Sequence, residues 1–95
     1  MKVVWLREAS LSLDKHYDYL VARNPKAASF VFKRIVASTK RLRQFPQSGR
    51  EGRFKGTREV VVPGVPYIVV YRVSATAVEI LRVFHTSSDW PRLMQ

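Results

Sequence analysis

Polar and apolar positions change their spacing about halfway along the chain. Between residues 8 and 44, apolar side chains recur every three or four positions and charged side chains fall between them. That period is typical of amphipathic helices. Asn24-Pro25 divides the segment, because Asn caps helices and Pro is tolerated at their first position. The pattern predicts two helices, over residues 8–23 and 25–44, that form an antiparallel hairpin.

A period of two, typical of strands, replaces the helical spacing after residue 56. Three segments are rich in Val, Ile and Tyr, namely residues 57–62, 67–73 and 78–85. Turns are expected at Pro63-Gly64 and at 74–76, and the apolar run 2–6 predicts a first strand. We predict an α+β fold of order β-α-α-β-β-β, an antiparallel sheet with the N-terminal helical hairpin packed on one face. A length of 95 residues suits one domain, so we expect residues 1–95 to form it.

Positive charge dominates the chain and is concentrated in its middle. Lys and Arg number 17 against 7 Asp and Glu, a formal net charge of +10, and Glu51 is the single acid between residues 23 and 58. Such an excess indicates an acidic partner, which can be nucleic acid, an anionic membrane or an acidic protein segment. Residues 48–56 contain three glycines, which predicts an exposed, mobile loop. The residues predicted to bind a partner are Arg50, Arg53, Lys55, Arg58, Arg72 and Trp90.

Cysteine is absent, which excludes disulfides and thiolate-bound metal and suits a reducing compartment. The start of the chain does not resemble a signal peptide, and its longest apolar run, 66–71, is far shorter than the ~20 residues that span a bilayer. No second His, Asp or Glu stands at metal-ligand spacing near His16. We expect a cytoplasmic protein without a metal, a cofactor or a membrane partner.

Several aromatic residues are assigned to packing. Trp5 lies in a predicted strand, and Tyr67 and Tyr71 share one face of another. His16, on the first helix, is assigned a surface or packing role. Trp90, in a polar tail, has two open roles: docking onto the sheet or contact with a partner.

Short motifs are spread over nearly the whole chain. They are Trp5 with Ala9, Asn24-Pro25 with Ala27-Ala28, Leu42 with Phe45-Pro46, Gly49-Arg50-x-Gly52, Gly56-Thr57-Arg58-Glu59, Pro66 to Arg72, Ile80 to His85, and Asp89-Trp90-Pro91. In this order and spacing they resemble the ParE branch of the ParE/RelE toxin superfamily. The resemblance implies a toxin of a type II toxin–antitoxin system, held inactive by a cognate antitoxin. It also implies one of two targets, because ParE-like members inhibit DNA gyrase whereas RelE-like members cut mRNA in the ribosome.

Cleavage of RNA without a metal needs a general base, a general acid and cations that stabilise the phosphorane charge. His85 is the best available acid or base, and Arg58, Arg72 and Arg82 could hold phosphate. Strand alternation predicts, however, that Arg82 and His85 point to opposite faces. It places Arg82 with Val78, Ile80 and Phe84, and His85 with Leu81 and Val83. Only a bulge or a strand end near Phe84 would bring the pair together.

Departures from the nuclease pattern decide between the two targets. The resemblance implies two features of a RelE-like nuclease: a basic residue at the position of Ile68, and a Tyr or His near the C-terminus. This chain has Ile68 at the first position, and its tail after His85 has no Tyr. We therefore favour gyrase inhibition over catalysis. The alternative is a ribosome-dependent mRNA endonuclease that uses His85, Arg82 and Arg58, and a third reading is a nucleic-acid-binding module without toxicity. In both toxin readings we expect an antitoxin segment that is amphipathic and net acidic, in a toxin–antitoxin hetero-oligomer.

Overall fold

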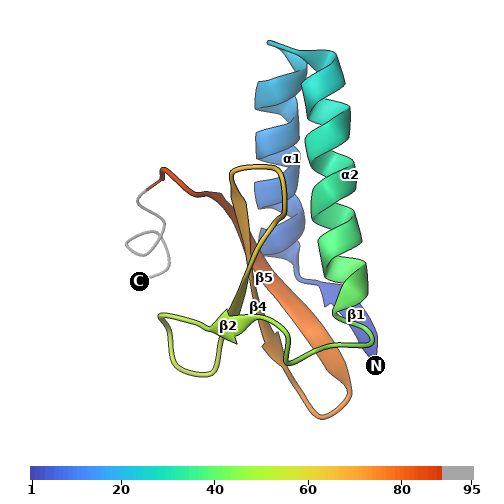
Figure 1. Ribbon diagram of the computed structural model, residues 1–95, viewed down its shortest axis with the longest axis vertical. Helices are drawn as coiled ribbons and strands as arrows, with labels where there is room; N and C mark the ends of the chain where they lie inside the picture. Colours follow the sequence, from blue (N-terminus) through green and yellow to red (C-terminus); the bar gives the residue numbers. More distant parts are fainter. Residues whose placement is uncertain (89–95) are drawn as a thin grey trace.

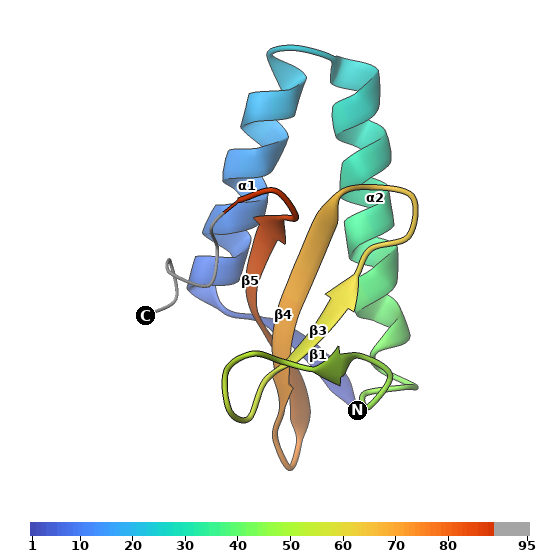
Figure 2. The same cartoon turned by 60° about the vertical axis from the view of Figure 1, so that its left-hand side comes forward.

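A hairpin of two helices packs on one face of a five-stranded sheet in the computed structural model, which describes residues 1–88 (Figures 1 and 2). The elements are β1 (Lys2–Trp5), α1 (Arg7–Val21), α2 (Pro25–Arg41), β2 (Arg50–Glu51), β3 (Arg58–Val61), β4 (Tyr67–Val73) and β5 (Ala77–His85). The strands lie in the order β1-β5-β4-β3-β2. The α+β class and the helical hairpin ahead of the main strands are thus confirmed.

The helices begin and pack as their sequence dictates. Asn24 has an extended backbone, and its Oδ1 accepts a hydrogen bond from the Ala27 N–H at 3.2 Å, while Pro25 opens α2. The apolar stripes of the two helices bury side chains such as Leu13 and Ile35 against the sheet. The turn between the helices projects past the end of the sheet (Figure 1). Within residues 1–88, no helix combines the length and the apolar character that crossing a membrane requires.

The sheet is mixed, whereas the sequence predicted an antiparallel one. β3, β4 and β5 form the expected meander, but β1 runs parallel to β5, with Val3 opposite Val78 and Trp5 opposite Ile80. The apolar run 2–6 fits either strand direction, so the sequence pattern could not distinguish a parallel from an antiparallel strand. The predicted loop 48–56 also contains a short strand, β2, in which Arg50 pairs with Glu59.

A register irregularity in β5 alters which side chains share a face. Val70 pairs with Arg82 but the next residue, Tyr71, pairs with Ile80, so Leu81 is an extra residue. Ile80 consequently packs in the core beneath the helices, whereas Arg82 lies on the opposite face beside Phe84. The prediction that Arg82 shares a face with Val78 and Ile80 was wrong, because a bulge shifts the alternation by one residue.

Side chains of α1 complete the hydrogen bonding of β5 where β1 ends. Beyond Ile80, whose carbonyl accepts from the Leu6 N–H, β5 has no strand neighbour on this edge. Ser12 Oγ accepts from the Val83 N–H at 3.0 Å, and His16 Nε2 lies 3.1 Å from the Val83 carbonyl oxygen. Since a carbonyl can only accept, His16 donates from Nε2. The sequence assigned His16 either a surface or a packing role, and the structure shows packing, because the ring is partly buried against β5.

Candidate protein-binding groove

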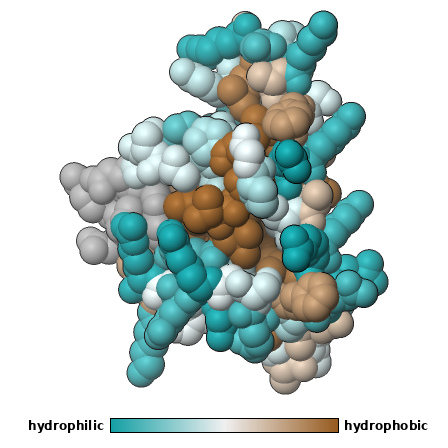
Figure 3. Space-filling model, viewed as in Figure 1, coloured by the Kyte–Doolittle hydropathy of each residue, from teal (hydrophilic) through white to brown (hydrophobic). Residues whose placement is uncertain are grey.

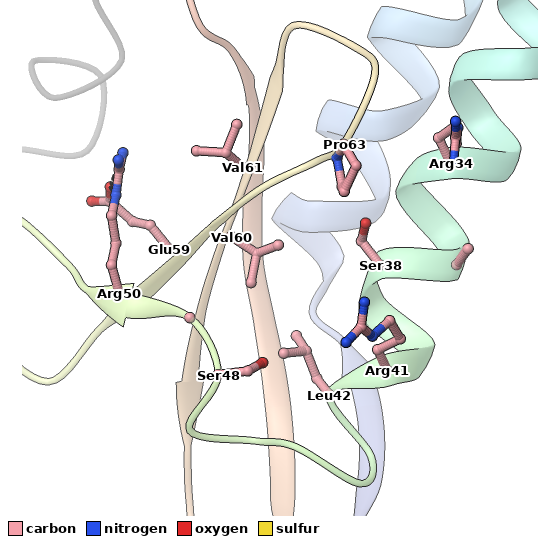
Figure 4. Close-up of a pocket in the computed structure, with 12 residues that line it drawn as sticks. Arg34, Ser38, Arg41, Leu42, Ser48, Arg50, Glu59, Val60, Val61 and Pro63 are labelled. Atoms are coloured by element: carbon pink, nitrogen blue, oxygen red, sulfur yellow. Dashed lines mark hydrogen bonds and ion pairs between the residues drawn. The ribbon is translucent and has the colours of Figure 1, made fainter.

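A groove of about 440 Å³ runs between α2 and the edge strand β3 (Figure 4). β3 lies beside β4 in the sheet, and α2 forms the opposite wall of the groove. Its walls come from α2, from the segment after α2 and from β3 with the turn that follows. The lining residues are Arg34, Ala37, Ser38, Arg41, Leu42, Ser48, Gly49, Arg50, Glu59, Val60, Val61 and Pro63.

The segment after α2 is fixed at the groove by one tyrosine. The hydroxyl of Tyr71, a residue with no exposed surface, donates to the Pro46 carbonyl at 2.8 Å and accepts from the Gly49 N–H at 2.9 Å. Burial raises the pKa of Tyr71, so the phenol remains a donor at physiological pH. A Cβ at position 49 would lie 2.7 Å from Tyr71 Cε1, which explains why glycine occupies the position.

A buried carboxylate organises the other end of the groove. Glu59 accepts hydrogen bonds at Oε1 from the Arg50 guanidinium and at Oε2 from the Arg53 backbone N–H, at 2.9 to 3.1 Å. These charge-assisted bonds connect β3 to β2 and to the chain that follows β2. Glu59, the one acid among the described residues that line the groove, is therefore already used to hold its structure.

Two arginines of α2 leave the groove strongly cationic. Arg34 and Arg41 are exposed and make no ion pair with any residue between 1 and 88. The guanidinium of Arg34 lies 5.2 Å from the centroid of the Phe30 ring. Two guanidinium groups without acidic partners provide a site for carboxylates.

The sheet edge beside these arginines is open. β2 pairs with β3 only at Arg58 and Glu59, so the edge is uncovered at Val61, whose surface is 49% exposed. Hydrophobic surface is visible in the middle of this side of the molecule, between hydrophilic residues (Figure 3). Unpaired backbone groups on a sheet edge accept an extended chain. The groove therefore suits an extended segment that carries both apolar and acidic side chains.

The residues predicted to bind a partner are spread over several places. Arg50 lines the groove, while Arg58 donates from Nη1 to the carbonyls of Gln47 and Gly49 at 3.3 and 2.8 Å and so holds the loop. Arg53 and Lys55 follow β2 in the loop. Arg72 forms an ion pair with Glu79. Trp90 lies outside the described residues.

The three residues of the nuclease hypothesis do not converge. Arg82 lies on the outer face of the sheet, where its Nε is buried without a hydrogen-bond partner among described residues. His85 lies on the face of the sheet that the helices cover, and its ring centroid is 5.1 Å from that of Tyr67. On β4, Arg58 pairs with Tyr71 and His85 pairs with Tyr67. These two positions are four residues apart, so Arg58 and His85 are separated by roughly 13 Å along the strand, at about 3.3 Å per residue. The predicted opposition of Arg82 and His85 is confirmed.

Arg34 and Arg41 belong to the basic segment 23–58 that the sequence identifies, but neither they nor Glu59 were among the residues predicted to bind a partner. The spacing of the two arginines could have identified them as a pair, because residues seven apart in a predicted helix lie on one side of it. Within residues 1–88, no three His, Asp or Glu side chains are close enough together to hold a metal ion.

Comparison with known proteins gives concordant matches. The family model described as the ParE toxin of the type II toxin–antitoxin system parDE matches residues 3–90. The chain is 40% identical over 93 residues to the protein named "Putative toxin Y4kP" from Sinorhizobium fredii, covering 98% of this chain and 96% of that protein. It also resembles a solved structure of the chromosomal ParDE TA system from P. aeruginosa, with a TM-score of 0.83 and 29% identity over 92% of this chain and 97% of the other.

Proposed function

Because the chain belongs to the ParE family of toxins from type II toxin–antitoxin systems, we propose that it inhibits DNA gyrase and is neutralised by a cognate antitoxin. The gyrase target is supported by the separation of Arg58, Arg82 and His85, which do not meet at one place as a base, an acid and phosphate-binding cations would have to. We infer that the toxin acts by binding its target. Gyrase works in the cytoplasm, where a cysteine-free chain suits the reducing conditions.

The groove between α2 and β3 supports the antitoxin as partner. Arg34 and Arg41 make no ion pair with any residue between 1 and 88, and the adjacent edge of β3 is open at Val61. An amphipathic, net acidic antitoxin segment would satisfy both features, since its carboxylates meet guanidinium groups and its backbone meets the sheet edge. A partner chain that orders on the toxin in this way adds its binding free energy to the stability of the fold.

A supercoiling assay tests the target. Purified toxin is titrated into gyrase, relaxed plasmid and ATP, and supercoiled and cleaved plasmid are measured on gels. We expect supercoiling to stop and gyrase-dependent cleaved plasmid to accumulate, and preincubation of the toxin with its antitoxin should restore supercoiling. Unchanged supercoiling at a high excess of active toxin would rule out gyrase as the target.

The endonuclease alternative needs its own readout. Primer extension on an mRNA translated in vitro detects cuts in the ribosomal A site. We expect none when the toxin is added at concentrations that stop supercoiling. Toxin-dependent cuts that disappear in His85→Ala would overturn the proposal in favour of the nuclease.

A further inference from the structure

The cations of α2 form two separate lines along the helix. Arg34 and Arg41 line the groove beside β3. Lys26, Lys33 and Lys40 are also spaced by seven residues, but this line is turned by about 100° from the arginines around the helix axis. Successive lysines lie about 20° apart around the axis and about 10.5 Å apart along it. They therefore form a nearly straight row beside the groove.

No internal partner neutralises this lysine row. Lys26, Lys33 and Lys40 are all exposed, and none makes an ion pair with a residue between 1 and 88. α2 contains no Asp or Glu, and the exposed acids of the hairpin, such as Asp14 and Asp18, belong to α1. Figure 3 shows hydrophilic side chains projecting one above another along the α2 side of the molecule.

Helix stability does not explain the row. A cation near the end of a helix interacts favourably with the helix dipole, which accounts for Lys40. Lys26 lies in the first turn, where the dipole is positive and an acid would be favourable, yet that turn contains none. The lysine row extends over the whole helix regardless of the dipole, which indicates an external polyanion.

The residue types on the two lines select different partners. The planar guanidinium groups in the groove match the two oxygens of a carboxylate, as an acidic peptide would offer. Lysine is a compact, mobile point charge that contacts phosphates without fixed geometry, which suits binding to a nucleic-acid backbone regardless of sequence.

The aromatic side chains near the row favour duplex over single-stranded nucleic acid. Binding to a single strand uses exposed rings on which bases stack. The exposed rings of α2 already have partners within the chain, because Arg34 lies over Phe30 and Phe32 packs edge-on against Tyr17. Because each of these rings is already in contact with another side chain, the row suits a stacked duplex, whose sugar–phosphate backbones face outward.

We propose that Lys26, Lys33 and Lys40 bind the phosphate backbone of duplex DNA independently of sequence. DNA binding by the lysine row is a property beyond gyrase inhibition, and either proposal can be disproved without the other. If both hold, the toxin is concentrated on the substrate of its target enzyme, while the arginine groove remains available to the antitoxin on another side of α2.

The test is the salt dependence of DNA binding. Affinity of the purified toxin for a fluorescein-labelled 20-base-pair duplex is measured by anisotropy over a range of NaCl concentrations. Each lysine that neutralises a phosphate contributes about 0.9 to the slope of log affinity against log salt. We expect K33Q/K40Q to flatten the slope by about 1.8, whereas R7Q/K15Q, which removes the same charge from exposed positions of α1, leaves it unchanged.

Several results would overturn the inference. One is a wild-type toxin that does not bind the duplex, and another is an equal change in both variants, which would show an effect of net charge alone. A third is a K33Q/K40Q variant that keeps the wild-type slope but loses antitoxin affinity, which would assign the row to the antitoxin interface. Circular dichroism confirms that both variants fold, and the supercoiling assay reports separately on gyrase.

Discussion

Arg50 donates two hydrogen bonds, from Nε and Nη2, to the same oxygen of the buried Glu59 carboxylate, Oε1, at 3.1 and 2.9 Å. The second oxygen, Oε2, accepts from the Arg53 N–H at 3.0 Å. One carboxylate thus fixes β2 against β3 and sets the direction of the chain beyond it. Because β2 begins at Arg50, opposite Glu59, the β3 edge from Val60 to Val61 has no pairing with β2 and stays open along the groove.

Glu59→Gln should destabilise the fold although it changes the side chain by one group. The amide keeps one acceptor, but its NH2 faces either the Arg53 N–H or the Arg50 guanidinium, and a buried donor is left without an acceptor. Such a loss costs about 1–3 kcal/mol of unfolding free energy. Urea denaturation followed by circular dichroism measures the cost.

Glu79→Gln is the matched control for Glu59→Gln. Glu79 pairs with Arg72, but the side chains of this pair are 25% and 52% exposed, whereas that of Glu59 is 1% exposed. Exposed ion pairs contribute about 0–1 kcal/mol. Equal destabilisation by the two substitutions would contradict the structural role assigned to Glu59.

Much of the architecture was predictable because local rules set it. Asn24-Pro25 marks the start of α2 by capping chemistry, and the change from helical to alternating spacing separates the hairpin from the sheet. The direction of β1 and the extra residue Leu81 were not predictable. Both depend on which edges remain free once distant strands have paired, and apolar periodicity carries no information on that.

The cations that line the groove could not be identified from the sequence either. Charge density predicts an acidic partner, but it cannot show which of the cations would bind it. Arg50 and Arg58 look alike in sequence, yet both are tied to groups within the chain, whereas Arg34 and Arg41 have no acidic partner between residues 1 and 88. Which cation is already used depends on tertiary contacts such as that of Glu59.

Tyr71→Phe should loosen the chain between α2 and β2. The substitution leaves the Gly49 N–H without its acceptor and the Pro46 carbonyl without its donor, which costs about 1–3 kcal/mol. Hydrogen exchange at the Gly49 amide should accelerate by more than the change in global stability accounts for. Tyr67→Phe is the control, because the Tyr67 hydroxyl makes no hydrogen bond with residues 1–88 and its loss should leave Gly49 exchange unchanged.

Stability should decrease in mild acid because of His16. Burial lowers the pKa of His16 below 6.5, and the neighbouring charges of His85 and Lys15 act in the same direction, while the hydrogen bond to Val83 opposes them. The unfolded chain therefore binds a proton near pH 6.5, and the folded chain binds it only at lower pH. Between these values the unfolded state holds more protons, so acid favours unfolding.

Urea denaturation at pH 7.5 and pH 5.5 measures this dependence. The wild-type protein should be less stable at the lower pH, and His16→Gln, whose amide can still donate to Val83, should lose much less on acidification. His16 and His85 are the two histidines of the chain, so His85→Gln is the control and should retain most of the pH dependence. A His16→Gln variant with the full wild-type loss would show that another group titrates.

Arg34→Gln combined with Arg41→Gln should weaken antitoxin binding at least 10-fold. Both guanidinium groups face the groove without an acidic partner among the described residues, and hydrogen bonds to charged groups contribute about 1.5–3 kcal/mol each when a carboxylate meets them. The loss should be largest at low salt and smaller at high salt, where screening already weakens the wild-type complex. Calorimetric titration of toxin with antitoxin at two salt concentrations measures both effects. K26Q/K33Q removes the same charge from the lysine row, so an equal loss of affinity in that variant would show that net charge, and not the groove, attracts the antitoxin.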